Sequence, residues 1–181
     1  MMPSLQLSTE DACGLAIGRW PRFCYDARGG GGTGEVGPEQ GGWCPLHFAP
    51  EQLTIPPLDW RSTRVLGLPL PPGLAIAIVP ELLSGRWQPA SGALELEFRA
   101  RFRFSIGALY RAPDLLVATR LCSGSASGER HRAQGAPLDG SGRAVLVGVA
   151  RIEPCGDPLL DRFLGLPDEA LAVLRCHLSP L

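Results

Sequence analysis

Residues 94–104, LELEFRARFRF, alternate strictly between apolar and charged side chains. The even positions carry Leu, Leu, Phe, Ala, Phe and Phe, whereas the odd positions carry only Glu or Arg. Because successive side chains of a β-strand point to opposite faces of a sheet, this pattern predicts a strand with one buried and one solvated face. Charges of both signs on the solvated face indicate cross-strand ion pairs, which explain Glu95 and Glu97 better than a catalytic pair of carboxylates does.

The sequence around this strand is typical of an antiparallel β protein. Short apolar runs separated by Pro and Gly favour a β sandwich or barrel over alternating strands and helices. Residues 82–87 and the turn 88–92 predict a hairpin partner for the strand. Further strands are expected at 74–79, 115–121 and 143–152. Since sequential strands usually pair, we predict an antiparallel β barrel or sandwich with meander topology.

A short helix is expected near the C-terminus, over residues 158–164. Asp157 is a favourable N-cap, Pro158 suits the first helical turn, and Gly165 is a matching stop. The apolar run 171–178 fits either a second helix or a closing strand, and its pattern does not decide between them. The predicted fold class is therefore mainly β, with one or two short C-terminal helices.

The first 50 residues have a different texture. Segment 29–42, GGGGTGEVGPEQGG, is nearly free of apolar side chains, which is typical of a flexible loop. Its stretch 32–37 matches the letters of a dinucleotide-binding motif but lacks the flanking strand and helix that such a site needs. We therefore divide the chain into an irregular N-terminal segment, residues 1–50, and a single β-rich domain, residues 51–181.

Composition excludes several classes of function. The formal net charge is −1, which provides no positive field for a nucleic-acid backbone, so nucleic acid is not expected as a partner. The chain contains no lysine, which excludes a side-chain Schiff base and a P-loop lysine. No apolar run reaches the roughly 18 residues of a spanning helix, and no signal region opens the chain, so we expect no transmembrane segment and a cytoplasmic location.

The sequence carries no motif for catalysis or metal binding. Its six cysteines include no C-x-x-C pair, its three histidines have no metal-ligand spacing, and no G-x-S-x-G element is present. We therefore expect free thiols, no catalytic residue, no metal and no cofactor. The same observations leave the question of enzymatic activity open and favour a protein that is not an enzyme.

The most unusual segment is 53–74, LTIPPLDWRSTRVLGLPLPPGL, in which proline-stiffened apolar residues surround Trp60, Arg61 and Arg64. One interpretation packs this segment over the end of a barrel as a lid. The other exposes it as a surface for a membrane interface or a protein partner. Packing is favoured, because long apolar loops usually cover something.

A second candidate site lies in segment 107–116, GALYRAPDLL. Tyr110 and Arg111 precede Pro113 at an expected strand break, where side chains can point into the mouth of a barrel. An arginine at such a mouth can bind a carboxylate or an anionic headgroup. A simple turn explains the segment equally well.

Four segments carry a resemblance to a known family: 53–74, FSIGALYRAPDLL at 104–116, GRAVLVGVARI at 142–152 and GDPLLDRFLGLP at 156–167. In these segments the chain resembles a family of conserved, poorly characterised cyanobacterial and plastid proteins. The resemblance covers residues from about 53 to the C-terminus and leaves the Gly-rich N-terminal segment outside. It implies a context in oxygenic photosynthesis and transfers no catalytic residue.

The sequence thus favours a non-enzymatic accessory or binding protein of the photosynthetic apparatus, peripheral to the thylakoid membrane. Its expected partner is an apolar small molecule or a membrane protein, bound through Trp60, Arg61, Arg64, Tyr110 and Arg111. If segment 53–74 is the working surface, then Trp60, Leu66, Leu68 and Leu70 should be accessible. The alternative is a β-barrel enzyme for a small hydrophobic substrate, using Tyr110, Arg111, Glu95 or His131.

Overall fold

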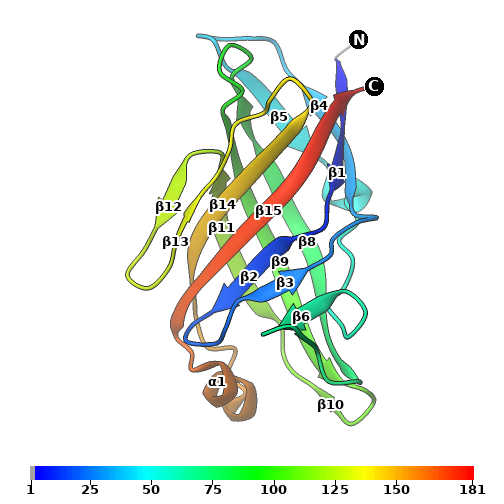
Figure 1. The fold of residues 1–181 in the computed structure, drawn as a ribbon, viewed down its shortest axis with the longest axis vertical. Coiled ribbons are helices and arrows are strands. Elements are labelled where there is room, and N and C mark those ends of the chain that lie inside the picture. The colour runs from blue at the N-terminus through cyan, green and yellow to red at the C-terminus, as the bar shows by residue number, and fades with distance from the viewer. Residues whose placement is uncertain (1–2) are drawn as a thin grey trace.

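A computed structural model describes residues 3–181 and consists mainly of one large antiparallel sheet (Figure 1). A single α-helix, α1, is present in this part of the chain, together with a short 3-10 helix at Pro50–Gln52. Along the chain the elements are β1 (Ser4–Thr9), β2 (Cys13–Ile17), β3 (Phe23–Tyr25), β4 (Gly31–Val36), β5 (Cys44–Phe48), β6 (Thr63–Val65), β7 (Leu68–Pro69), β8 (Leu74–Trp87), β9 (Leu94–Ile106), β10 (Tyr110–Arg111), β11 (Leu115–Cys122), β12 (Ser125–Ser127), β13 (Arg132–Gln134), β14 (Arg143–Ile152), α1 (Pro158–Leu164) and β15 (Asp168–Pro180).

The sheet closes on itself as a barrel. Its strands are hydrogen bonded in the order β1, β4, β5, β8, β9, β11, β14 and β15, and β15 pairs back with β1. Every one of these pairings is antiparallel. A barrel of eight strands has an interior just wide enough for side chains to fill it, or to hold one small ligand.

The wall divides at β15. The C-terminal half of β15 pairs with β1, whereas Ala170–Val173 pair with β2, which continues through β3, β6 and β7. The wall thus has two arms, one that continues through β1 and β4 and one that continues through β2 and β3. Residues 53–58, which we call the strap, lie between these arms. Thr54 bridges to Gly31 of β4, and Leu58 bridges to Ile76 of β8. The strap therefore completes the wall where the arms separate.

The central strands confirm the mainly β prediction. β9 extends from Leu94 to Ile106, and its inward positions are buried in the predicted alternation. β8, β9, β11, β14 and β15 pair as a meander in chain order. The predicted helix is α1, where Asp157 accepts a hydrogen bond from the Leu159 amide and Gly165 is left-handed with φ 71°. Residues 171–178 belong to strand β15.

Two predicted strands, 74–79 and 82–87, are one strand. β8 runs through Pro80, and its register on β9 shifts between Pro80 and Leu82. Proline cannot donate to the ladder, and a β-bulge accommodates it within a continuous strand. The proline therefore marks a bulge and not an end.

The prediction of an irregular segment over residues 1–50 is wrong. Residues 4–48 form β1 to β5, and the predicted flexible loop contains β4. Glycine hides the alternation of this strand because it replaces apolar side chains at crowded inward positions. A Cβ at Gly34 would lie 2.5 Å from the Phe48 ring, and a Cβ at Gly31, where φ is 128°, would lie 1.9 Å from the Leu7 carbonyl oxygen.

The outer face of the barrel carries the expected ion pairs. Glu95 contacts Arg86 at 2.8 Å and Arg120 at 2.5 Å across neighbouring strands. Partial desolvation opposes ionisation of Glu95, but its hydrogen bonds to the two arginines outweigh desolvation and lower its pKa. Arg101 pairs with Glu81 at 3.1 Å. This face is therefore an ordinary charged surface.

We expect Gly31→Ala to destabilise the fold by at least about 2 kcal/mol, because the added Cβ meets the Leu7 carbonyl in a backbone region that disfavours alanine. The free energy of unfolding in urea measures this effect. Gly140→Ala is the control, since nothing lies within 4 Å of a Cβ there, and its effect should stay within about 0.5 kcal/mol. Equal stability of the two variants would contradict the close approach of β4 to β1.

Candidate functional site

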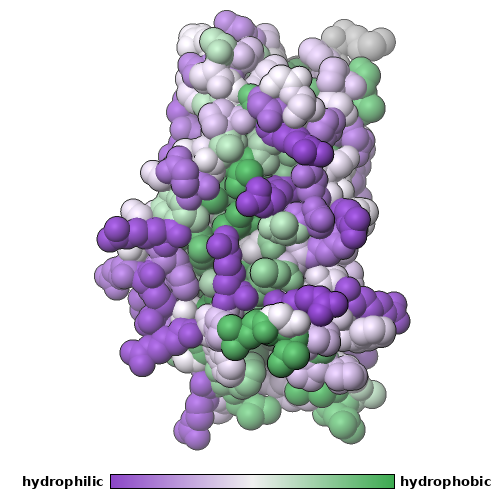
Figure 2. All heavy atoms as spheres, viewed as in Figure 1, coloured by the Kyte–Doolittle hydropathy of each residue, from purple (hydrophilic) through white to green (hydrophobic). Residues whose placement is uncertain are grey.

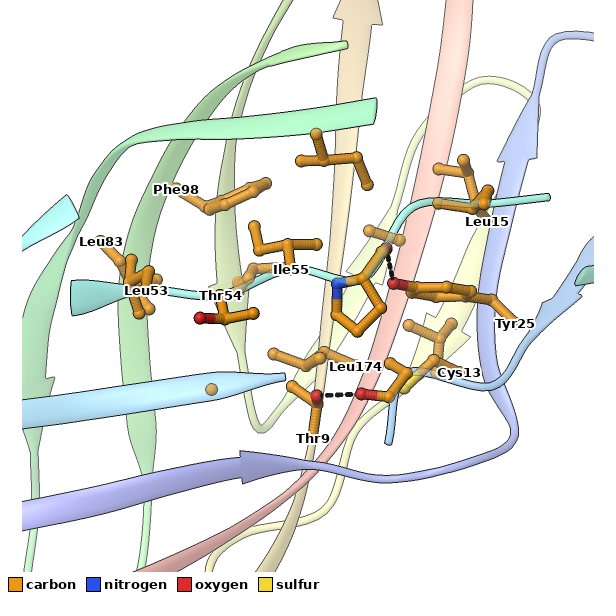
Figure 3. Close-up of a pocket in the computed structure, with 18 of the residues that line it drawn as sticks. Thr9, Cys13, Leu15, Tyr25, Leu53, Thr54, Ile55, Leu83, Phe98 and Leu174 are labelled. Carbon is orange, nitrogen blue, oxygen red and sulfur yellow. Dashed lines mark hydrogen bonds between the residues drawn. The ribbon is translucent and has the colours of Figure 1, made fainter. Parts of the chain in front are cut away.

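The interior holds a cavity of about 130 Å³ at the level where the wall divides. Its wall is almost entirely apolar. Strands β2, β8, β9 and β15 and the strap contribute to it (Figure 3). Residues that line it include Cys13, Leu15, Tyr25, Leu53, Ile55, Pro56, Ile78, Leu83, Phe98, Phe102, Ala172 and Leu174.

The period of two in the strands directs these side chains inward. Phe98 and Phe102 occupy even positions of β9, on the face opposite its arginines. Ala172 and Leu174 occupy the equivalent face of β15. Two of the three core clusters within residues 3–181 contribute most of the cavity wall, one that includes Ile76 and another that includes Phe48.

Four polar side chains line the cavity, and all of them except the solvent-exposed Thr54 bond to protein groups. The Thr9 hydroxyl donates to the Ala27 carbonyl oxygen at 2.5 Å, and the Tyr25 hydroxyl donates to the Pro56 carbonyl oxygen. The Cys13 thiol donates to the Glu10 carbonyl oxygen with a separation of 3.4 Å. A guest in this cavity therefore meets hydrocarbon groups on nearly all sides.

Burial alters the titration of two of these groups. Desolvation raises the pKa of the Cys13 thiol and the pKa of the Tyr25 hydroxyl. A buried thiol with a raised pKa is a poor nucleophile at neutral pH, because the thiolate is the reactive form. The cavity therefore favours binding over covalent chemistry.

The strap is attached to the barrel mainly at its two ends. Among the described residues, positions 55–57 make no backbone–backbone hydrogen bond. Pro56 and Pro57 have no N–H, and their carbonyl oxygens accept from the Tyr25 hydroxyl and, at 2.9 Å, from the Ser62 hydroxyl. These two side-chain bonds hold the middle of the strap, and Figure 3 shows the one between Tyr25 and Pro56.

Segment 53–74 combines both interpretations made from the sequence. Its first part is the strap, which walls the cavity, and Leu70 is buried with 5% exposure, contrary to the expectation that it is accessible. Trp60, Leu66 and Leu68 are exposed. The segment thus packs over the barrel at one end and presents apolar side chains to solvent at the other.

The predicted site residues Trp60, Arg61 and Arg64 lie together outside the cavity. The Arg61 guanidinium lies 5.2 Å from the centre of the Trp60 ring. Arg64 belongs to β6, and its guanidinium donates to the Gly67 carbonyl oxygen at 3.3 Å. The structure therefore brings these three residues to one turn and its following hairpin.

Tyr110 and Arg111 form β10 and line no part of the cavity. The Tyr110 hydroxyl donates to the Asp157 carboxylate, and this bond raises the pKa of Tyr110 to about 12. Arg111 is exposed. Glu95 and His131 are also absent from the cavity wall, so the four residues considered for an enzyme do not meet there.

A second hollow, of about 440 Å³, lies between the β2–β3 turn, α1 and the start of β15. Trp20 and Phe163 stack in it with ring centres 4.8 Å apart. Arg19, Arg130 and Arg162 also line it, and Arg130 pairs with Asp168 at 3.0 Å. This hollow is polar and is separate in character from the apolar cavity.

Sequence reasoning missed the cavity residues. Phe98 and Phe102 were recognisable as inward positions, but nothing in the sequence indicated a space beside them. Thr9, Cys13 and Tyr25 belong to the segment predicted as irregular. Their role depends on contacts with residues distant in the chain, which no local pattern reports.

Comparison with family models, curated proteins and solved structures finds no match to this chain. No helix within residues 3–181 is long and apolar enough to cross a membrane. In the same residues, no group of three or more His, Cys, Asp or Glu side chains is placed to hold a metal ion. Functional inference therefore rests on the geometry described above.

We expect Tyr25→Phe to lower the free energy of unfolding by about 1 kcal/mol at neutral pH, since it removes the bond to Pro56. This difference should vanish above about pH 10. The folded chain holds the Tyr25 proton more tightly than the unfolded chain, whose tyrosine pKa is about 10, so the wild type loses stability as pH rises further. Urea unfolding of both proteins between neutral and alkaline pH measures the crossover, and a constant difference would contradict a buried hydroxyl.

Proposed function

We propose that this protein is a non-enzymatic binding protein that holds a small apolar molecule inside its barrel. The observation that carries the proposal is the interior cavity of about 130 Å³ with its hydrocarbon wall. An apolar cavity of about 150 Å³ in another protein stays dry and binds benzene or xenon. The present cavity therefore suits a guest of one small ring or a short hydrocarbon chain.

An empty cavity of this size is unfavourable for the fold. Its surroundings lose dispersion contacts that a guest would restore. Ala27 and Ala172 line the space, and a larger side chain at either position would reduce it. Small residues around a space that a guest can fill support binding.

The wall also defines the chemistry of the guest. Within residues 3–181 no charged side chain lines the cavity, so an ionised group would enter without a partner and lose its hydration. The hydroxyl groups of Thr9 and Tyr25 already bond to the backbone, and Thr54, the third residue in the wall with a hydroxyl group, is exposed to solvent. The expected ligand is therefore a neutral, largely hydrocarbon molecule.

The proposal includes a cellular setting. The resemblance of residues 53–181 to cyanobacterial and plastid proteins supports a role in the photosynthetic apparatus, on the cytoplasmic side and peripheral to the thylakoid. There the apolar molecule is the ligand, and a membrane protein is the alternative partner for the surface that carries Trp60.

An enzyme for a small hydrophobic substrate is the weaker alternative. General acid or base catalysis needs a titratable group that reaches the substrate. The titratable groups in this cavity, Cys13 and Tyr25, are bonded to backbone oxygens and keep their protons. The cavity geometry therefore supports binding more strongly.

Native mass spectrometry of the protein purified gently from its natural host tests the proposal. A bound small molecule, extracted and identified as neutral and apolar, is the expected result. A clean apoprotein that also fails to bind added toluene, observed by methyl chemical-shift changes of the cavity leucines, would refute it.

Ala172→Leu should fill part of the cavity, abolish toluene binding and raise the free energy of unfolding by about 1–2 kcal/mol. Ala118→Leu is the matched control, because Ala118 is exposed on the outer face of β11 and should leave binding intact. Titration with toluene and urea unfolding measure the two effects. Undiminished toluene binding by Ala172→Leu would place the guest elsewhere.

A further inference from the structure

Leu66 occupies an unfavourable position at the tip of the β6–β7 hairpin. Val65 pairs with Leu68, and the two residues between them have positive φ, 53° for Leu66 and 79° for Gly67. Such a two-residue turn normally carries Asn-Gly, because the left-handed region brings a Cβ close to the following carbonyl. Leu66 is also 80% exposed. Both the left-handed backbone conformation and the exposure of an apolar side chain to water disfavour leucine at this position. These two costs point to a function for Leu66.

Other exposed apolar side chains lie on neighbouring turns. Leu109 is exposed in the β9–β10 turn, which is joined to the chain before β8 by a bond from the Gly107 amide to the Gly73 carbonyl oxygen at 2.8 Å. Tyr110 links β10 to the start of α1, whose Leu159 is also exposed. β6, β10 and α1 lie in the lower part of the barrel as drawn, where Figure 2 shows hydrophobic side chains at the surface (Figure 1).

Arginines accompany these apolar side chains without ion pairs. Among the described residues, Arg61, Arg64 and Arg111 make no salt bridge, although all three are exposed. The arginines of β9 differ, since each of them contacts a carboxylate, either Glu81 of β8 or Asp114 just before β11. These three arginines thus offer unpaired guanidinium groups to an external partner.

We propose that this end of the barrel docks on an anionic lipid surface, with Leu66 and Leu68 entering the apolar layer. Trp60 suits the interface, where an aromatic ring meets both headgroups and hydrocarbon. Arg61 and Arg64 suit lipid phosphates, because their stems cover apolar surface while their guanidinium groups stay at the headgroups. Apolar side chains on separate turn tips, interspersed with unpaired arginines, fit a bilayer better than a single flat protein interface does.

This inference rests on the proposed function, because it identifies the source of the apolar ligand. The strap ends at Leu58, two residues before Trp60, and the Ser62 hydroxyl donates to the Pro57 carbonyl oxygen at 2.9 Å. The docking turn is thus bonded to the cavity wall. A ligand that moves from the bilayer into the barrel beside the strap need not cross bulk water.

Flotation with phosphatidylcholine vesicles, prepared with and without phosphatidylglycerol, tests the docking. The full chain should float with vesicles that contain phosphatidylglycerol and dissociate as salt is added, because screening weakens the arginine contacts. Arg61→Gln combined with Arg64→Gln should lower the apparent partition coefficient by about tenfold at low salt.

Leu66→Asn gives the sharper test, because asparagine tolerates the left-handed turn. It should lower vesicle partitioning by about tenfold and also raise the melting temperature by about 2 °C. If Leu66 only stabilised the fold, its replacement would lower the melting temperature and leave vesicle partitioning unchanged. Leu181→Asn is the matched control, since Leu181 is 73% exposed at the C-terminus, at the other end of the barrel (Figure 1), and should leave flotation unchanged.

Absence of flotation with either kind of vesicle would overturn the docking. The exposed leucines would then serve self-association or a contact of Leu68 with a soluble protein. Equal losses for Leu66→Asn and Leu181→Asn would overturn it as well. Toluene binding separates this inference from the proposed function. If the protein binds toluene but does not float with vesicles, the proposed function stands and the docking is refuted. If it floats with vesicles but does not bind toluene, the docking stands and the proposed function is refuted.

Discussion

The pairing of one strand with two others is the constraint on which the rest of the structure depends. β15 pairs with β14 along one edge and, along the other, with β1 and then with β2. The wall must open where β1 and β2 separate, and peptide groups in an open wall need hydrogen-bond partners. The strap supplies them through Thr54 and Leu58. Between these residues Pro56 and Pro57 have no N–H, so the middle of the strap has fewer donors to satisfy.

The cavity follows from the same division. An eight-stranded barrel is normally filled by inward side chains from all its strands. Here the strap replaces a regular strand beside the cavity, and its residues do not follow the inward and outward alternation of a ladder. Ala27 and Ala172 also line the space and add little volume to it. The space therefore lies beside the strap, enclosed by side chains of both core clusters that do not fill it.

The sequence was sufficient wherever a local pattern controls the structure. The alternation of 94–104 predicted β9 and its faces, and Asp157 with Gly165 predicted the ends of α1. Local patterns failed at β4, where Gly34 occupies a position next to the Phe48 ring and carries no apolar signal. They also failed at the cavity, because Tyr25 and Pro56 meet only after β2, β3 and the strap are assembled. Such contacts depend on tertiary pairing, which residue spacing does not encode.

Segment 53–74 both packs over the barrel and exposes an apolar surface, the two alternatives that the sequence offered for it. Its strap contacts the interior, and its hairpin exposes Leu66 and Leu68, with the Ser62 hydroxyl bonded to the strap between them. A bilayer that holds the hairpin and a guest that contacts the strap therefore act on one continuous piece of chain. If either event shifts the strap, linkage requires that the guest alter membrane affinity by the same factor as the membrane alters guest affinity. In that case a filled barrel and an empty one differ in their affinity for the membrane, which is the property that a carrier needs to load at one surface and leave it.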